Sequence, residues 1–225
     1  GEIPLCLPKK KFGLFEKKTV IAVGGYDNST MGEDMELVVR LHEFSRMNRK
    51  PYKIHFAQDA ICWSQTPEKL SELCKQRKRW QRGLFQCMWG HRKMLANPRY
   101  GAVGLLSYLY FLLYELLSPF IELFGVLTMV LSVMMDMLNV KFMLVFLACY
   151  ALYGILLTLT AYFSRIYTID QKLSFRELIL AIIACFFETT FLRFYLVFVR
   201  VTAFVGYKKN KLNWGKLERK KMNRI

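Results

Sequence analysis

The basic stretch KQRKRWQRG, residues 75–83, contains side chains that could bind a phosphorylated sugar. A guanidinium group matches phosphate oxygens in a planar fork, an indole face stacks on a sugar ring, and an amide orients hydroxyl groups. Gln76, Arg79, Trp80 and Gly83 are spaced i, i+3, i+4 and i+7, so on a helix they share one face. Gly83 leaves room for a close approach to the backbone. The spacing therefore predicts one combined surface.

A second interpretation of the same stretch is equally well supported by the residues alone. Tryptophan is enriched at membrane interfaces, and cytoplasmic flanks of membrane spans are rich in lysine and arginine. Residues 75–83 hold Lys75, Arg77, Lys78, Arg79 and Arg82 shortly before a long apolar region. The stretch is thus either a ligand-binding surface or a membrane anchor.

Two acidic residues, Glu33 and Asp34, form the other candidate for chemistry. Thr30 and Glu33 have the spacing of a capping box, and Asp34 begins the i, i+3, i+4, i+7 apolar series that continues with Leu37. This predicts a helix with Asp34 in its first turn, on or beside the buried face, where the helix dipole favours an ionised carboxylate. Spacing alone favours the interpretation that the two acids only stabilise the start of the helix over the interpretation that they are a catalytic pair.

The elements around these residues alternate between turns, a strand and helices. The apolar run 20–23 precedes a turn at Gly24 and Gly25, and alternating residues within 52–63 predict a strand. A helix is expected over 67–95, with Thr66 as its cap, Pro67 in its first turn and an apolar stripe along one side.

Composition indicates an integral membrane protein with a polar half. The 225 residues carry a net charge of +16 and are 54% hydrophobic, and the two properties are segregated along the chain. The six cysteines form no C-x-x-C pair and the three histidines are scattered, so neither a zinc site nor a redox motif is supported. No zinc-finger or RNP-like pattern accompanies the charge, which excludes nucleic acid as the expected partner and favours anionic lipid or phosphate.

Three apolar segments are expected in the membrane region, 101–205. The first, about 105–135, is one kinked or tilted span interrupted at Ser118–Pro119, and the second is a clear span over 141–163. The third, 178–205, is interrupted by charged residues and has basic flanks at both ends. A re-entrant or interfacial helix is preferred there, with a full span as the second possibility. Residues 206–225 form a basic tail expected on the cytoplasmic side.

Glu115, Ser118 and Glu122 form a polar stripe on the first of these segments, at i, i+3 and i+7. Such a stripe could line a polymer exit path. Polar contacts between helices, or with the interface, are the better supported interpretation.

Two stretches together resemble family 2 glycosyltransferases, the membrane-bound synthases of cellulose, chitin, hyaluronan and poly-N-acetylglucosamine. GGYDNSTMGEDMEL resembles the family's glycine-pair turn and E-D motif, and QRKRW satisfies its Q-x-x-R-W pattern at Gln76, Arg79 and Trp80. The resemblance covers residues 1–100 at motif level. It implies an α/β fold, the C-terminal half of an A-type glycosyltransferase domain that includes interface helix 67–95, followed by a transmembrane helical region.

The resemblance also implies roles for individual residues. Asp34 would be the general base, supported by Glu33, while Gln76 and Arg79 would lie near the donor diphosphate. Trp80 would border the acceptor sugar, and Gly25 of the glycine pair would contact substrate. The implied reaction is inverting transfer from a nucleotide-sugar donor, with UDP as the expected nucleotide, to a growing glycan at the cytoplasmic face of the plasma membrane. Q-x-x-R-W favours processive polymerisation.

No D-x-D motif occurs in the sequence, so the ligands for Mg²⁺ or Mn²⁺ and the nucleotide-binding half are expected to precede Gly1. This chain alone is then expected to be incomplete and inactive, completed by a longer natural chain or an accessory subunit. The competing function is a non-catalytic membrane module whose basic helix and tail bind anionic lipid or a partner protein.

Overall fold

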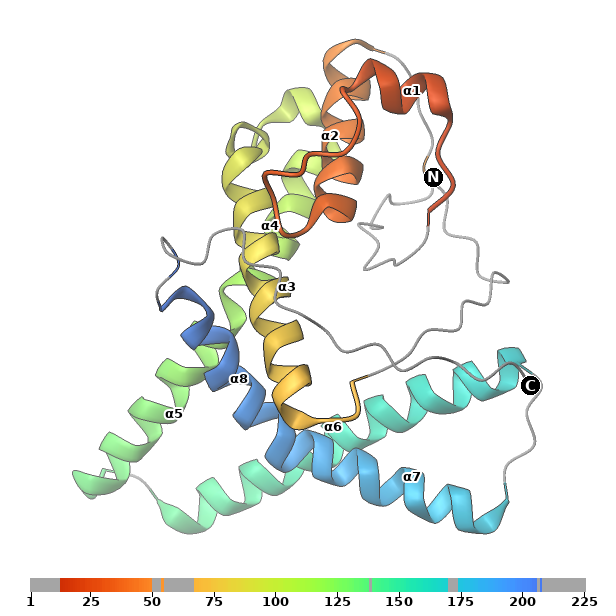
Figure 1. The fold of residues 1–225 in the computed structure, drawn as a ribbon. Coiled ribbons are helices and arrows are strands. Elements are labelled where there is room, and N and C mark those ends of the chain that lie inside the picture. The colour runs from red at the N-terminus through yellow and green to blue at the C-terminus, as the bar shows by residue number, and fades with distance from the viewer. Residues whose placement is uncertain are drawn as a thin grey trace. The chain divides into compact units, whose positions relative to one another are not determined.

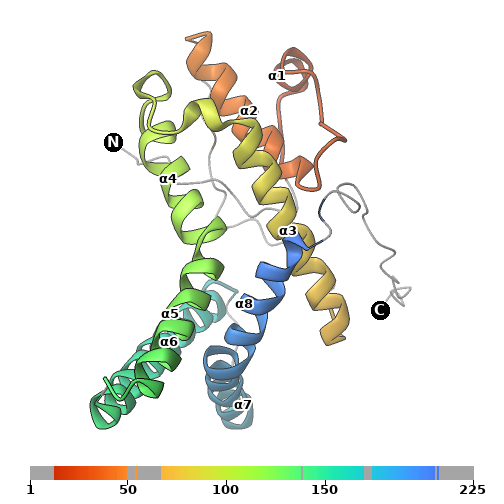
Figure 2. The ribbon, with the colours of Figure 1, turned by 90° about the vertical axis from the view of Figure 1, so that its left-hand side faces the viewer.

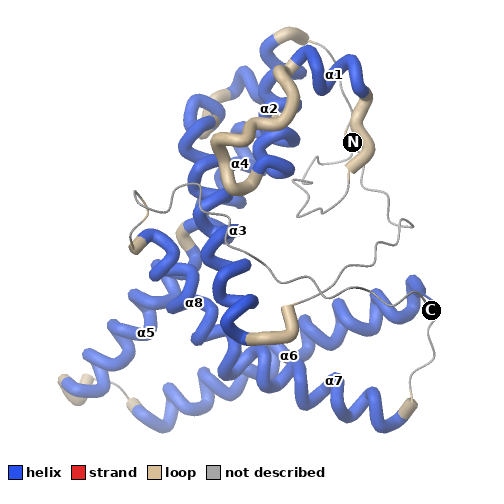
Figure 3. The backbone as a smooth tube through the Cα atoms, in the orientation of Figure 1, coloured by secondary structure: helices blue, strands red, loops and turns tan. Residues whose placement is uncertain are grey.

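A computed structural model of the chain describes residues 13–49, 54, 67–137, 139–169, 174–205 and 207. All regular structure in these residues is helical (Figures 1 and 3). The strand expected within 52–63 lies outside the described residues apart from Ile54, so the α/β class stays a prediction. The chain divides into two compact units, residues 1–118 with 199–225, and residues 119–198. The expected division at residue 100 stays a prediction.

The first unit begins with α1 (Lys17–Ala22), which takes up most of the apolar run 20–23. The turn predicted after it is confirmed: Gly24 and Gly25 have φ angles of +91° and +76°, a region that side chains with a Cβ rarely adopt. Arg40 of α2 (Glu33–Met47) holds this turn, since its guanidinium donates to the carbonyl oxygens of Val23 at 2.9 Å and Gly25 at 2.6 Å.

Helix α2 begins differently from the prediction. Its N-cap is Gly32 without a side-chain cap, so the capping box of Thr30 and Glu33 is wrong. Thr30 lies two residues before the cap, and its hydroxyl donates to the Asp27 carbonyl at 3.3 Å instead. Asp34 does lie in the first turn, but it is exposed rather than on the buried face. The surrounding elements bury α2 only from Glu36 onward.

Helix α3 (Leu70–Gly90) is shorter than the predicted 67–95. Its N-cap is Lys69 in an extended conformation, so Pro67 lies outside the helix, and Thr66 lies outside the described residues. A 3₁₀ turn, η1 (Arg92–Met94), follows. The buried residues of α3 all lie in its second half: Gln81, Gly83, Leu84, Cys87 and Met88.

The core of the first unit includes residues from 101–118, part of the region that was expected to lie in the membrane. Short helical segments follow α3: η2 (Pro98–Tyr100), η3 (Val103–Ser107), α4 (Tyr108–Tyr110) and η4 (Phe111–Leu116), of which η3 and η4 are π-helical. The Tyr108 hydroxyl donates to the Met88 carbonyl at 2.5 Å. The buried cluster consists of Val39, Leu84, Cys87, Met88, Met94, Tyr100, Val103, Tyr108, Phe111 and Leu116.

The membrane region continues with longer apolar helices (Figure 2). They are α5 (Ser118–Met134), α6 (Val140–Ile169), α7 (Phe175–Phe187), η5 (Glu188–Leu192), α8 (Arg193–Val201) and η6 (Thr202–Phe204). Two helices, Val140–Ser164 and Phe175–Phe204, are each long and apolar enough to cross a membrane. The pair Val103–Leu116 and Ser118–Met134 passes the same test only together, as a span broken beside the expected Ser118–Pro119.

The length and composition of Phe175–Phe204 fit a full span, the second of the two possibilities for the third segment. Its charged Arg193 is paired within the second unit. Arg193 donates to both carboxylate oxygens of Glu122, at 3.1 and 3.2 Å, and lies 5.6 Å from the ring centre of Tyr150. Glu122 therefore makes a contact between helices, the better supported interpretation of the polar stripe.

Candidate active site

The start of α2 and the second half of α3 touch through two glycines. A Cβ on Gly83 would lie 2.8 Å from the backbone nitrogen of Gly32 and 3.0 Å from its Cα, so only glycine permits this approach. One turn further along α3, Gln86 accepts a hydrogen bond from the Met31 N–H at 2.8 Å. Gly83 thus makes room for the protein's own backbone rather than for a ligand.

This contact brings the segment just before the E-D motif against the part of α3 just after the Q-x-x-R-W motif. Gly32 comes two residues before Asp34, and Gly83 comes three residues after Trp80 on the same face of α3. The segments are far apart in sequence and meet at backbone level. The glycine contact thus joins residues that flank the E-D and Q-x-x-R-W motifs.

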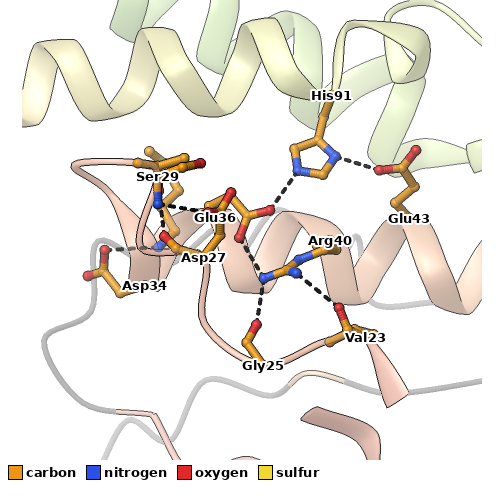
Figure 4. Close-up of polar contacts among 11 residues, drawn as sticks. Val23, Gly25, Asp27, Ser29, Asp34, Glu36, Arg40, Glu43 and His91 are labelled. Carbon is orange, nitrogen blue, oxygen red and sulfur yellow. Dashed lines mark hydrogen bonds and ion pairs between the residues drawn. The ribbon is translucent and has the colours of Figure 1, made fainter. Parts of the chain in front are cut away.

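Asp34 is open to solvent and has few contacts of its own. One carboxylate oxygen accepts the N–H of Met35 at 2.9 Å, as Figure 4 shows. Glu33, the first residue of the helix, is partly buried. An exposed carboxylate can accept a proton from a group that approaches it.

Gly25 contributes backbone rather than side-chain space. Among the residues that the structure describes, no atom lies within 4 Å of where a Cβ on Gly25 would be, and the Gly25 carbonyl oxygen is held by Arg40. The peptide groups of the turn are therefore fixed while the α-carbon faces open space.

The Q-x-x-R-W residues lie on the first half of α3. Gln76 and Arg79 are partly buried, and the Trp80 side chain is 41% exposed. The guanidinium carbon of Arg77 lies 5.1 Å from the Trp80 ring centre, so Arg77 covers the indole. Its buried Nε has no hydrogen-bond partner among the residues that the structure describes.

Sequence reasoning missed Arg77 as a site residue. The i, i+3 spacing of Arg77 and Trp80 was the available signal.

A buried polar cluster fixes the elements behind these motifs (Figure 4). Glu36 of α2 accepts from Arg40 at 2.8 Å and lies 3.2 Å from His91 Nε2, while His91 Nδ1 lies 2.5 Å from Glu43. Burial alone would lower the pKa of His91, but the hydrogen bonds to Glu36 and Glu43 outweigh it, so the pKa is raised. The cluster links the glycine turn, α2 and the end of α3.

The described residues around this site include neither a reactive Cys87 thiol nor a group of metal ligands. Burial raises the pKa of the Cys87 thiol to about 12, which keeps it protonated and unreactive at neutral pH. Among the described ranges, no three His, Cys, Asp or Glu side chains are grouped so that they could hold a metal ion.

Comparisons with known proteins agree with the motifs. The sequence profile described as glycosyl transferase family group 2 matches residues 11–201. A poly-beta-1,6-N-acetyl-D-glucosamine synthase of Staphylococcus aureus (strain COL) is 35% identical over 86 residues, which are 38% of this chain and 18% of that protein. The synthase of the same name from Staphylococcus epidermidis (strain ATCC 35984) is 34% identical over 86 residues, with the same coverage.

The matched segment is thus about a fifth of the length of these curated relatives, 18% in both cases. No solved structure matches the chain significantly. The profile match extends over most of the sequence, including both motifs and the apolar helices. The chain belongs to glycosyl transferase family group 2.

Proposed function

We propose that this chain supplies the acceptor side of a membrane-bound glycosyltransferase that transfers a sugar, with inversion, from a nucleotide-sugar donor to a growing glycan. The contact between Gly32 and Gly83 is the observation that carries the proposal. It fixes the start of α2, with its exposed carboxylate, against a helix whose first half carries an indole, an amide and guanidinium groups.

In the proposed reaction, Asp34 is the general base. An acceptor hydroxyl near Asp34 gives its proton to the carboxylate as its oxygen attacks the anomeric carbon of the donor. The new glycosidic C–O bond forms on one face of the sugar while the bond to the nucleotide diphosphate breaks on the opposite face. The electron pair of the broken bond leaves with the diphosphate, and the anomeric centre is inverted.

The cationic and aromatic groups of α3 complete the assignment. Arg79, with Gln76, is proposed to stabilise the growing charge on the leaving diphosphate. The exposed indole of Trp80 is proposed to stack on the acceptor sugar, with Arg77 behind it.

Several features of the whole protein are part of the same proposal. The names of the relatives favour a poly-N-acetylglucosamine type of product. The Q-x-x-R-W pattern favours processive synthesis, as the family resemblance implies. The basic flanks favour a catalytic part on the cytoplasmic face of the plasma membrane, in contact with anionic headgroups. A UDP-linked donor, Mg²⁺ or Mn²⁺ and the nucleotide-binding half are assigned to sequence before Gly1 or to an accessory subunit.

Substitution of Asp34 by Asn in the natural full-length protein tests the proposal. Loss of a general base should reduce sugar transfer by ~10³-fold, measured as incorporation of labelled sugar from its nucleotide donor in membranes. Membrane association and the amount of folded protein should not change, since the side chain is exposed.

The matched control is Asp27→Asn. Asp27 accepts the Ser29 N–H at 2.8 Å in the turn before α2, and asparagine forms such turns equally well. This variant should retain transfer. If Asp34→Asn transfers sugar as fast as Asp27→Asn does, Asp34 is not the base. A non-catalytic membrane module would give that result.

A further inference from the structure

Gln81, the second glutamine of KQRKRWQRG, lies buried directly after Trp80. Its side chain is only 2% exposed, and both ends of its amide are used. The Nε2 group donates to the carbonyl oxygen of Leu116 at 2.9 Å, and the Oε1 atom accepts from the Nε of Arg200 at 2.9 Å. A buried amide that is satisfied at both ends has one preferred orientation.

Arg200 completes the arrangement from the end of the third apolar helix. Its Nη2 group donates to the carbonyl oxygen of Glu115, so one guanidinium holds both Gln81 and the end of η4. All of these groups belong to the first unit. An arginine in an apolar helix is costly unless it has such polar partners.

The two carbonyl groups need partners for different reasons. In a continuous α-helix the Glu115 carbonyl would accept the N–H of residue 119, and proline has none. Leu116 is the last residue of η4, and carbonyls at a helix end lack partners within the helix. Near a bilayer, such groups must be satisfied by other parts of the protein.

A neighbouring contact holds α3 on a second side. The Nε of Arg82 donates to the carbonyl oxygen of Ala203 at 2.6 Å. Residues 81 and 82 point about 100° apart around the helix axis, so the two anchors together resist both sliding and rotation of α3. Rotation of α3 would change the direction of Gln76, Arg79 and Trp80 on the half that precedes them.

We infer that Gln81 and Arg200 are positioning residues, which set the rotation of α3 by clamping it to the carbonyl groups of Leu116 and Glu115 at the helix break before Pro119. The inference rests on the function proposed for the Q-x-x-R-W surface. It assigns one role to three features that are separate in the sequence: a glutamine beside the motif, an arginine in an apolar segment, and a proline at a break between helices.

The test uses Gln81→Leu, Arg200→Met and the double variant in the full-length protein. Because each loses a buried polar partner, each single variant should lower kcat by ~10-fold per folded molecule while the donor KM changes little. The double variant should be no worse than the worse single variant, since the residues act as a unit. Multiplied effects would overturn the clamp.

Arg193→Met is the matched control, because Arg193 lies on the same helix and is also paired, but with Glu122. It should leave kcat per folded molecule unchanged. Arg200→Lys keeps the charge without the planar fork, and it provides a milder variant should Arg200→Met fail to fold. An Arg200→Lys enzyme with the kcat of wild type would overturn the positioning role.

Hydrogen exchange of peptides within residues 76–83 separates this inference from the proposed reaction. Exchange should accelerate by ~10-fold in Arg200→Met and not in Arg193→Met, whether or not the protein transfers sugar. Equal exchange in the two variants would overturn the clamp. Faster exchange in Arg200→Met with an unchanged kcat would leave the clamp in place but overturn its positioning role. Absence of sugar transfer by the wild type would refute the proposed function and leave the clamp untouched.

Discussion

The two halves of α3 are built for different purposes. Residues 70–80 contain no buried side chain, whereas residues 81–90 contain Gln81, Gly83, Leu84, Cys87 and Met88, all buried. The second half is fixed by the core, by the Gly32 contact and by hydrogen bonds to carbonyl groups. The first half carries the Q-x-x-R-W residues, of which Gln76 and Arg79 are partly buried and Trp80 is exposed.

Helix α3 thus has an anchored half, residues 81–90, and a presented half, residues 70–80. The rigidity of the anchored half positions the presented half, which then need not contribute to stability. Substitutions in the presented half should change activity with little effect on stability. Substitutions in the anchored half should change stability, and the change in stability should in turn change activity.

Among substitutions that test the difference between the two halves of α3, the largest effect is expected at Gly83. The Cβ of a Gly83→Val variant would collide with the backbone of Gly32, so α2 and α3 must separate. We expect a destabilisation of about 2–3 kcal/mol together with loss of sugar transfer. Thermal unfolding in detergent and transfer assays measure both effects.

Gly90→Ala provides the control for Gly83, because no atom lies within 4 Å of where its Cβ would be. This variant should be neutral or slightly stabilised, since alanine favours helix. Equal behaviour of the two variants would show that the Gly32 contact is unimportant.

A smaller effect, confined to activity, is expected at Trp80. Trp80→Ala should lower transfer by ~10-fold through loss of about 1.4 kcal/mol of sugar stacking, with unfolding unchanged. Trp80→Phe should lose less. Trp89→Ala removes the other exposed tryptophan of α3, which is 62% exposed on the anchored half, and should keep its activity. Equal transfer by Trp80→Ala and Trp89→Ala would contradict the comparison.

The anchored half should also respond to pH through His91, which caps its end. Because the pKa of His91 is raised in the folded protein, its contribution to stability is fully present below the unfolded pKa of about 6.5 and is lost as pH rises through the folded pKa. Unfolding temperatures measured from pH 6 upward should therefore fall in wild type. His91→Gln should cost about 1–3 kcal/mol at pH 6 and remove this part of the pH dependence.

The smallest effect is expected away from α3, in the second unit. Glu122→Gln weakens the pair with Arg193 and should cost only about 0.6 kcal/mol, the average for a polar contact between membrane helices. The unfolding temperature should shift slightly and transfer should not change. A loss of transfer comparable with that of Trp80→Ala would indicate that Glu122 belongs to the product path.

The sequence predicted several elements well. The glycine turn, the position of Asp34 in a first helical turn, the helix carrying Q-x-x-R-W and the apolar helix at 141–163 all follow from local patterns, and the structure contains each of them. The capping box at Thr30 and the helix start at Pro67 were wrong. The boundaries of a helix depend on which backbone groups at its ends find hydrogen-bond partners, and a short sequence motif does not determine this.

The sequence by itself determined the family motifs, the segregation of charge from apolar residues and the helical periodicity, because these are properties of neighbouring residues. Only the tertiary structure decided that Gly83 meets Gly32 and that Arg77 covers Trp80. It also decided that Gln81 and Arg200 bond to each other and to one carbonyl group each before Pro119. These pairings join residues from different elements, apart from Arg77 and Trp80, where the choice depends on rotamers. Contacts of both kinds depend on which surfaces pack together, and no local pattern records that choice.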